Sequence, residues 1–300
     1  MADAGPGTPH FAADHRAIRL ACYAVLYLVW GSTYLAMRFA LETLPLFLLA
    51  SARFAVAGAL LLGVAAARGA SQPTLRQWWH SAAVGALLLL GGNASVLWAV
   101  RRVPTGTTAL IIAITPLWLA LLSRARPTRG LVVGMALGLL GVAALVVPGM
   151  AGQEGGTDAL SVVVLVLASL SWAIGSLVAR KGGPPSGLVA TGAQMLAGGL
   201  LLLVIALAAG EPAALAEAQV SWRSVASLVY LTVFGSIVGY SAYGWLLRHD
   251  TPERAATYAY VNPVVAVVLG ALFADEVITG HVLVSGALVV VGVALIVRGK

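Results

Sequence analysis

Long apolar runs, separated by short polar or Gly/Pro-rich breaks, dominate the sequence from about residue 20 to its end. A helix needs about 20 mostly apolar residues to cross a bilayer core of ~30 Å. The pattern predicts ten membrane-spanning helices, at 20–37, 46–67, 81–100, 103–122, 131–147, 160–179, 188–209, 225–247, 255–274 and 280–297. We therefore expect an all-α polytopic membrane protein.

The composition excludes several other classes of protein. Apolar residues make up 60% of the chain and charged residues 10%, against roughly 45–50% and about 25% in soluble domains. A soluble fold of this size would lack the polar residues to cover its core. The single cysteine, Cys22, rules out an intramolecular disulfide and a cysteine metal cluster. We expect no metal, no cofactor and no nucleic-acid partner.

The basic residues specify an orientation. If the N-terminus is inside, 13 of the 18 Lys and Arg residues fall in inner segments, and Arg38, Arg101, Arg102 and Arg223 fall in outer ones. Arg53 alone lies within a span. Short loops rich in Lys and Arg stay on the cytoplasmic side. The unequal distribution of the basic residues, which give the chain its net charge of +7, therefore predicts that both termini lie in the cytoplasm. We expect the chain in the inner (plasma) membrane.

The two halves of the chain repeat each other. The spacing is 18 residues from Trp98 to Pro116 and from Trp245 to Pro263, and eight from Trp30 to Arg38 and from Trp172 to Arg180. Five spans is an odd number, so the second copy must cross the membrane in the opposite direction. Inverted repeats of this kind are an architecture of secondary transporters, with the substrate site near the midplane.

These spans divide the chain into five parts. We expect a cytoplasmic tail at 1–19, a first five-helix repeat at 20–147, a Gly-rich linker at 148–159, a second repeat at 160–297 and a cytoplasmic end at 298–300. The fifth and tenth spans carry few polar residues. They are expected to be outer scaffold helices, in a monomer or at the contact face of a homodimer.

Several motifs resemble the drug/metabolite transporter superfamily in its ten-helix EamA-like branch. They are Trp30-Gly-Ser-Thr-Tyr-Leu-Ala-Met-Arg38, Ala52-Arg-Phe54, Ala109 to Pro116-Leu117, Asn262-Pro263, Glu276-Val-Ile-Thr279, Gly286 and Gly292. The resemblance covers residues 20–297, and within the branch the chain is similar to YddG-type exporters of aromatic and other amino acids. It implies export of small metabolites through a central cavity. One departure is Arg126-Pro-Thr128, where the family usually has a Glu-containing turn.

The ionisable residues limit the mechanism. No Asp or Glu falls inside a predicted span, although Glu42, Asp275 and Glu276 lie close to outer span ends. This argues against a carboxylate proton relay and favours facilitated diffusion or exchange. Arg53 has two interpretations: it binds a substrate carboxylate, or it bonds helix-end carbonyls or snorkels to the interface. Its counterpart in the second repeat is Gln194.

Aromatic and polar side chains at depth are the candidate substrate contacts. Eleven residues form this set: Trp30, Tyr34, Arg53, Asn93, Trp98, Trp172, Gln194, Tyr240, Tyr243, Tyr258 and Asn262. A polar group at mid-span must face the protein interior or a wet cavity; interior packing and interfacial anchoring remain alternatives for the aromatic residues. Pro116 and Pro263 each remove a helix hydrogen bond, so they are hinges for alternating access or fixed bends.

The sequence holds no metalloprotease, nucleophile-elbow or P-loop motif. We expect a transporter that exports small organic metabolites, amino acids in particular and aromatic ones among them, by alternating access in the lipid bilayer. A carrier of phosphorylated or nucleotide sugars is the alternative within transport, and it would require several cations in the cavity. An integral-membrane enzyme or a scaffold is the alternative of another class.

Overall fold

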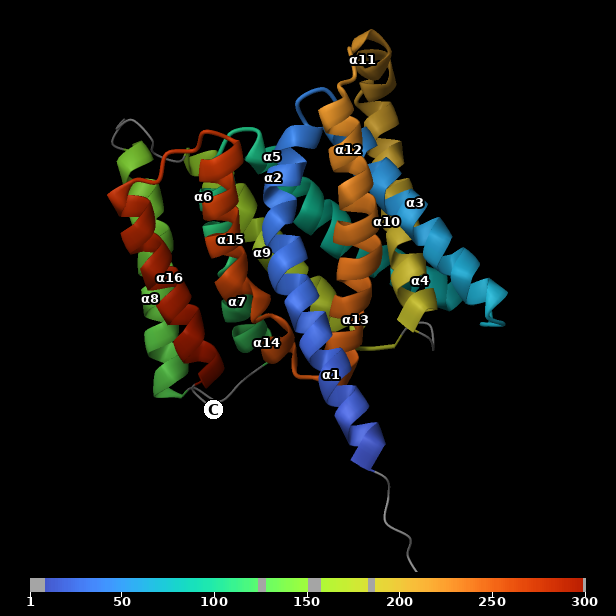
Figure 1. The fold of residues 1–300 in the computed structure, drawn as a ribbon, viewed down its shortest axis with the longest axis horizontal. Coiled ribbons are helices and arrows are strands. Elements are labelled where there is room, and N and C mark those ends of the chain that lie inside the picture. The colour runs from blue at the N-terminus through green and yellow to red at the C-terminus, as the bar shows by residue number, and fades with distance from the viewer. Residues whose placement is uncertain (1–8, 124–127, 151–157, 183–186, 299–300) are drawn as a thin grey trace, which may run out of the picture.

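A computed structural model describes residues 9–123, 128–150, 158–182 and 187–298, and every regular element in these ranges is helical (Figure 1). In chain order the elements are α1 (Pro9–Val25), η1 (Leu26–Trp30), α2 (Gly31–Ala40), α3 (Leu46–Ala67), α4 (Leu75–Gly85), η2 (Ala86–Ala94), α5 (Ser95–Val100), α6 (Thr105–Ile112), α7 (Thr115–Leu122), α8 (Arg129–Met150), α9 (Ala159–Ala179), α10 (Gly187–Ala208), α11 (Glu211–Glu217), α12 (Trp222–Tyr230), η3 (Leu231–Val238), α13 (Gly239–His249), α14 (Pro252–Ala255), α15 (Tyr258–Phe273) and α16 (Gly280–Arg298). The η segments are π-helical.

All ten predicted spans are present as helices. Seven are long and apolar enough to cross a membrane: Arg16–Ala40, Leu46–Ala67, Leu75–Val100, Thr105–Leu122, Ala159–Ala179, Gly187–Ala208 and Trp222–His249. Shorter apolar helices at Val132–Gly141, Val261–Phe273 and Gly280–Gly292 account for the remaining three. Large aliphatic side chains such as Leu28, Val229 and Leu272 are exposed on the outside, as expected for a surface that faces lipid. The predicted fold class is confirmed.

The second repeat runs opposite to the first. The start of α1 and the end of α16 lie on one face of the bundle, together with the 68–74 and 250–251 connections (Figure 1). We call it the terminal face. The opposite face carries α11 and the 41–45, 101–104 and 274–279 connections. Helix α1 runs away from the terminal face and α9 runs toward it, so the corresponding first spans of the repeats are antiparallel.

The helix boundaries differ from the sequence prediction in four places. The first span begins at Pro9 instead of residue 20, and a short helix, α11, lies between α10 and α12. The fourth span is broken at 113–114, because Pro116 starts a new helix, α7, in whose first turn its missing N–H is tolerated. The start of the ninth span is a separate turn of helix, α14. The predicted linker falls largely on 151–157, outside the described residues.

Three spans change from α- to π-helix near their middle. These segments are η1 in span 1, η2 in span 3 and η3 in span 8. The 147-residue offset from Trp98 to Trp245 maps the range of η2 onto 233–241, which overlaps η3. The π-helical distortion is therefore shared by the two repeats. Such segments are rare and occur frequently at functional sites.

Helices α3 and α10 pack backbone against backbone. A Cβ added at Gly58 would overlap the backbone of α10, lying 2.7 Å from the carbonyl oxygen of Gly192. A Cβ at Gly199 would lie 2.9 Å from the Cα of Ala55 in α3. Apolar burial does not drive helices together in lipid, so glycines that permit close approach stabilise the pair. This contact joins the second span of one repeat to the second span of the other.

We predict that Gly58→Val lowers the thermal stability of the detergent-purified protein, because the new side chain has no space between α3 and α10. Overpacking of this kind costs about 1–3 kcal/mol. Gly63→Val is the matched control, since Gly63 lies on the same helix with nothing within 4 Å of its added Cβ. Equal melting temperatures for the two variants would contradict the packing.

Candidate functional site

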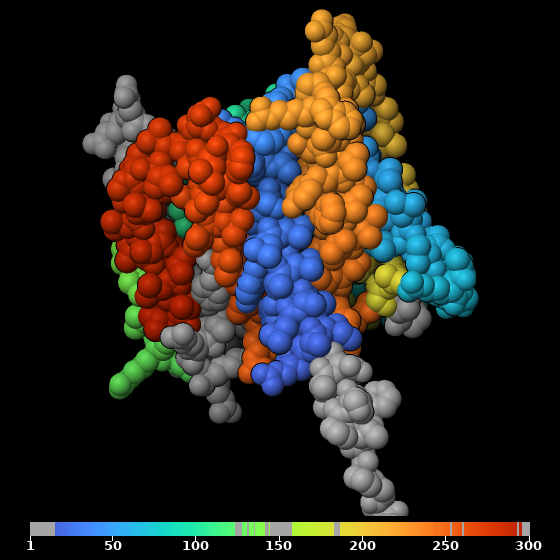
Figure 2. Space-filling view, in the orientation of Figure 1, coloured from blue at the N-terminus to red at the C-terminus, as the bar shows by residue number. Residues whose placement is uncertain are grey.

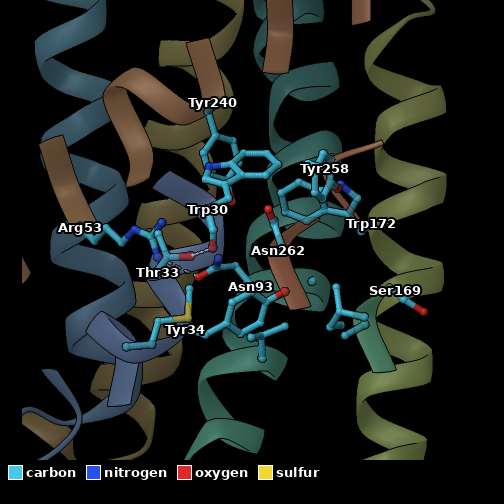
Figure 3. A pocket seen from close by; sticks show the side chains of 15 residues that line it. Trp30, Thr33, Tyr34, Arg53, Asn93, Ser169, Trp172, Tyr240, Tyr258 and Asn262 are labelled. Atoms are coloured by element: carbon cyan, nitrogen blue, oxygen red, sulfur yellow. Dashed lines mark hydrogen bonds between the residues drawn. The ribbon is translucent and has the colours of Figure 1, made fainter. Parts of the chain in front are cut away.

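A small internal cavity of about 60 Å³ lies at the centre of the bundle (Figure 3). Seven spans contribute to its wall, and they come from both repeats: spans 1 to 4 of the first, and 6, 8 and 9 of the second. Eight of the eleven residues predicted from sequence line it, namely Trp30, Tyr34, Arg53, Asn93, Trp172, Tyr240, Tyr258 and Asn262. The wall also includes residues that sequence reasoning missed: Thr33, Met37, Gly92, Val96, Ile112, Ala168 and Ser169.

The cavity lies deep within the bundle. Most of its lining side chains are buried, including Tyr34, Asn262 and Ser169. Span 1 lies between spans 8 and 9 and fills the surface that separates them (Figure 2). The cavity is therefore covered on this lateral side of the bundle by span 1.

An aromatic cluster forms one side of the cavity. The ring of Trp30 lies 5.5 Å from that of Trp172, 5.3 Å from Tyr240, 5.2 Å from Tyr243 and 4.9 Å from Tyr258, measured between centroids. Three of these pairs have the edge-to-face or tilted geometry that aromatic rings prefer, at interplanar angles of 65° or more. The cluster joins spans 1, 6, 8 and 9.

Glycines of η3 and α13 contact Trp30. Its indole Nε1 donates to the carbonyl oxygen of Gly235 at 3.1 Å, which supplies the partner that a buried indole N–H requires. A Cβ at Gly239 would lie 2.9 Å from Cδ1 of Trp30. Span 8 can therefore approach Trp30 this closely only because position 239 is glycine, whereas a Cβ at Gly235 would crowd Arg53 and Thr33 instead.

Arg53 lies opposite the aromatic cluster and is 1% exposed. Its Nε donates to the hydroxyl of Ser236 at 2.7 Å, and its Nη1 donates to Oδ1 of Asn93 at 3.3 Å. Its guanidinium carbon is 4.7 Å from the centroid of the Phe54 ring. These partners belong to η3, η2 and α3, so the side chain points into the bundle and does not snorkel toward an interface.

The charge of Arg53 is not balanced by a salt bridge. In the described part of the chain the ion pairs are Arg38–Glu276, Arg223–Glu42 and Arg254–Asp250, and none involves Arg53. A buried charge held only by neutral groups carries a large desolvation cost. An anion bound in the cavity would offset that cost. The geometry therefore suits a carboxylate or another small anion.

Asn262 binds the backbone of span 1. With its amide nitrogen turned toward span 1, it donates to the carbonyl oxygens of Leu26, Tyr27 and Tyr258, each at 3.2 Å. Leu26 and Tyr27 begin the π-helical segment η1. Pro263 follows Asn262 inside α15, and Pro116 lies next to the break between α6 and α7. Both prolines are therefore near the cavity wall, and their role as hinges stays a prediction.

Three of the predicted residues lie outside the central cavity. Trp98 stacks under the guanidinium of Arg102 at 4.0 Å, toward the opposite face. Gln194 and Tyr243 line a second small cavity of about 40 Å³ on the terminal-face side. Tyr243 also belongs to the aromatic cluster, and its hydroxyl lies 2.7 Å from the hydroxyl of Ser176.

A buried carboxylate joins three elements at the opposite face. Glu276, with 8% of its side chain exposed, accepts from Nη1 of Arg38 at 2.7 Å. It also accepts from the backbone N and the hydroxyl of Thr105 at 2.8 and 2.9 Å. It therefore joins the end of α2 and the start of α6 to the 274–279 connection. The sequence placed Glu276 near a span end but gave no sign that Thr105 would meet it.

A central cavity between two inverted five-helix repeats is the arrangement of a secondary transporter. The EamA-like transporter family matches the chain twice, at residues 18–147 and 159–298. The chain belongs to the EamA-like transporter family.

Related proteins span nearly the whole chain. It is 37% identical to the uncharacterized inner membrane transporter YedA of Escherichia coli K12 over 280 residues, 92% of this chain and 89% of YedA. It is 29% identical to a probable terminal-alkyne amino-acid exporter of Streptantibioticus cattleyicolor, over 90% of each chain. A protein of known crystal structure shares the fold with a TM-score of 0.67 at 20% identity, covering 93% of this chain and 96% of the other.

We predict that Glu276→Gln makes the cavity more accessible from the opposite face, because it removes the ion pair with Arg38 and weakens the bonds to Thr105. If the substitution destabilises the closed arrangement of this face by about 1.4 kcal/mol, the equilibrium between its closed and open arrangements changes tenfold. The measurement is the rate at which a membrane-impermeant thiol reagent labels a cysteine in the cavity. This cysteine is introduced by Thr33→Cys, and Cys22→Ser removes the native one. Labelling should be faster in the Glu276→Gln variant.

Glu42→Gln is the control for this measurement. Glu42 forms an exposed pair with Arg223 at 3.4 Å on the same face, and exposed pairs contribute little. If the cysteine is labelled at the same rate in the protein with Glu276 and in the Glu276→Gln variant, the carboxylate does not hold this face closed.

Proposed function

We propose that the protein exports small organic metabolites, amino acids including aromatic ones, by alternating access of the central cavity. The observation that carries the proposal is Arg53, a buried cation without an ion-pair partner in the described chain. Its guanidinium suits a substrate carboxylate, and the aromatic cluster around Trp30 suits an apolar or aromatic side chain. Both repeats contribute to the wall of the cavity, as alternating access between inverted repeats requires.

The proposed transport is uncoupled from protons. Among the described residues, none of those lining the central cavity is an Asp or a Glu. A carboxylate relay of the kind found in proton-driven carriers has no candidate there. Movement of substrate down its own gradient, or in exchange for another substrate, is the mechanism we propose.

We place the chain in the inner membrane with the terminal face in the cytoplasm. The Lys and Arg bias supports this orientation, and the relative YedA is an inner membrane transporter by name. One relative is named as a probable amino-acid exporter, which supports this class of substrate. The narrower similarity to YddG-type exporters stays a prediction.

A carrier of phosphorylated or nucleotide sugars is less well supported. Two or more negative charges on a phosphate group call for several cations around it. Among the described residues that line the central cavity, Arg53 is the single Lys or Arg. A single guanidinium matches the one negative charge of an amino-acid carboxylate.

We predict that the purified protein in liposomes catalyses counterflow of radiolabelled L-phenylalanine without a pH gradient. Arg53→Gln is expected to reduce the flux roughly 10- to 100-fold, because hydrogen bonds to charged groups contribute about 1.5–3 kcal/mol. Arg53→Lys keeps the positive charge but loses the forked arrangement of guanidinium donors. Its flux should lie between those of the wild-type protein and Arg53→Gln.

Arg223→Gln is the control, since it removes an exposed arginine of the opposite face. The melting temperature of each variant separates loss of binding from loss of fold, because Arg53 also joins three spans. If the wild-type protein moves no amino acid, the substrate proposal is wrong. Flux that needs a proton gradient would exclude the uncoupled mechanism.

A further inference from the structure

We propose that Arg248 and Arg180 form a second anion-binding subsite, between the terminal face and the central cavity, which receives the substrate carboxylate before it reaches Arg53. The proposal rests on the export function proposed above and narrows its substrates. Compounds with a carboxylate, whether anions or zwitterions, are accepted. Purely cationic compounds are rejected.

A chain of three hollows leads from the terminal face to the centre. A groove of about 390 Å³ opens between α3, α10 and α13. It shares Thr191 and Arg248 with the second cavity, which also contains Arg180 and Gln194. The second cavity in turn shares Tyr240 with the central cavity. Tyr240 is therefore part of the wall of both the second cavity and the cavity that contains Arg53.

The lining of this path is basic throughout. Arg68 and Arg248 line the groove, Arg180 and Arg248 line the second cavity, and Arg53 lines the central one. Among the described residues, no Asp or Glu lines any of the three. A recess walled by one sign of charge concentrates the opposite ion. The path therefore attracts anions and repels cations along its whole length.

Local contacts hold both arginines in place. The Nη1 of Arg180 donates to the carbonyl oxygens of Leu247 and Asp250 at 3.0 and 3.1 Å, where α13 ends. The guanidinium of Arg248 lies over Gly187, at which an added Cβ would be 2.7 Å from its Nη1. The first contact fixes Arg180 through one of its three nitrogens, and the second holds Arg248 beside the groove.

The nearest acidic group has other partners. Asp250 accepts a hydrogen bond from the hydroxyl of Tyr23 at 2.9 Å and forms an ion pair with Arg254 at 3.6 Å. In the groove itself, the buried hydroxyl of Ser241 has no hydrogen-bond partner in the described chain. This hydroxyl is enclosed by protein, so the charged group that the groove offers a ligand here is the guanidinium of Arg248.

The repeat symmetry supports a site here. Gln194 is the counterpart of Arg53, and Arg180 is the counterpart of Arg38. Two residues of the second cavity therefore occupy the positions that hold Arg38 and Arg53 in the first repeat. A purely topological role, in which Arg180 and Arg248 only orient the chain in the membrane, would not require them to line the same internal cavity.

Charge selectivity is tested by competition with radiolabelled L-phenylalanine in inside-out membrane vesicles that contain the full-length protein. Unlabelled L-phenylalanine and 3-phenylpropionate should inhibit uptake, and phenethylamine, which lacks the carboxylate, should not. Equal inhibition by phenethylamine would overturn the restriction to carboxylates. Inhibition by inorganic phosphate but not by 3-phenylpropionate would overturn it in favour of phosphate recognition.

The subsite itself is tested by Arg248→Gln and Arg180→Gln. Each should raise the KM for entry from the terminal face about tenfold while the maximal rate changes less than twofold. The KM for entry from the opposite face, measured in right-side-out vesicles, should stay unchanged while the maximal rate from that face falls about tenfold, because an uncoupled carrier has the same ratio of maximal rate to KM in both directions. Arg16→Gln, which removes an exposed arginine of α1 on the same face, is the control.

The outcomes separate the two proposals. If wild-type vesicles transport phenylalanine but neither variant changes the KM at the terminal face, the subsite is wrong and the export function stands. If the wild type transports no amino acid, the proposed function itself fails. Should Arg180→Gln fail to fold, the exposed Arg248 still provides the test, and Arg180→Lys provides a conservative variant.

Discussion

The burial of Arg53 is the constraint on which the centre of this protein depends. A guanidinium withdrawn from water must have its donors satisfied, and here the partners are a hydroxyl from η3 and an amide from η2. Both segments are π-helical, and they overlap under the repeat. Gly235 leaves space for the side chain, since a Cβ there would lie 3.0 Å from its Nη2. The π-helical segments η2 and η3 therefore supply the hydrogen-bond partners of the buried guanidinium, and Arg53 joins the two segments.

The aromatic cluster packs against the same part of span 8 that binds Arg53. Trp30 reaches the carbonyl of Gly235 and packs on Gly239, so span 8 binds both the cation and the rings. The cavity between them has a charged side and an apolar side, which is what a zwitterionic molecule with an apolar side chain would need. Because the contacts come from both repeats, a rearrangement of one repeat against the other must alter the cavity.

Much of this architecture could be predicted from the sequence, because lipid imposes simple rules. Apolar length gives the spans, and a polar residue at mid-span must face inward, which is why Arg53, Asn93 and Asn262 could be selected. Other features depend on tertiary contacts. The π-helical segments are changes of hydrogen-bond register with no residue pattern of their own, whereas the break at 113–114 follows from Pro116. The bonds of Glu276 to Thr105 join residues 171 positions apart, and no local spacing encodes them.

The carboxylate at the opposite face has a consequence for the symmetry of the transport cycle. In the first repeat, the corresponding turn between the fourth and fifth spans, Ser-Arg-Ala-Arg-Pro-Thr at 123–128, has no Asp or Glu. Two identical inverted copies would give inward-open and outward-open states of equal free energy. Here the contacts at the opposite face include the bonds of Glu276 to Arg38 and Thr105. The corresponding turn of the first repeat has no carboxylate to form such bonds at the terminal face. Under the proposed alternating access, these bonds would make the free energies of the two states of the empty carrier unequal before any substrate gradient acts.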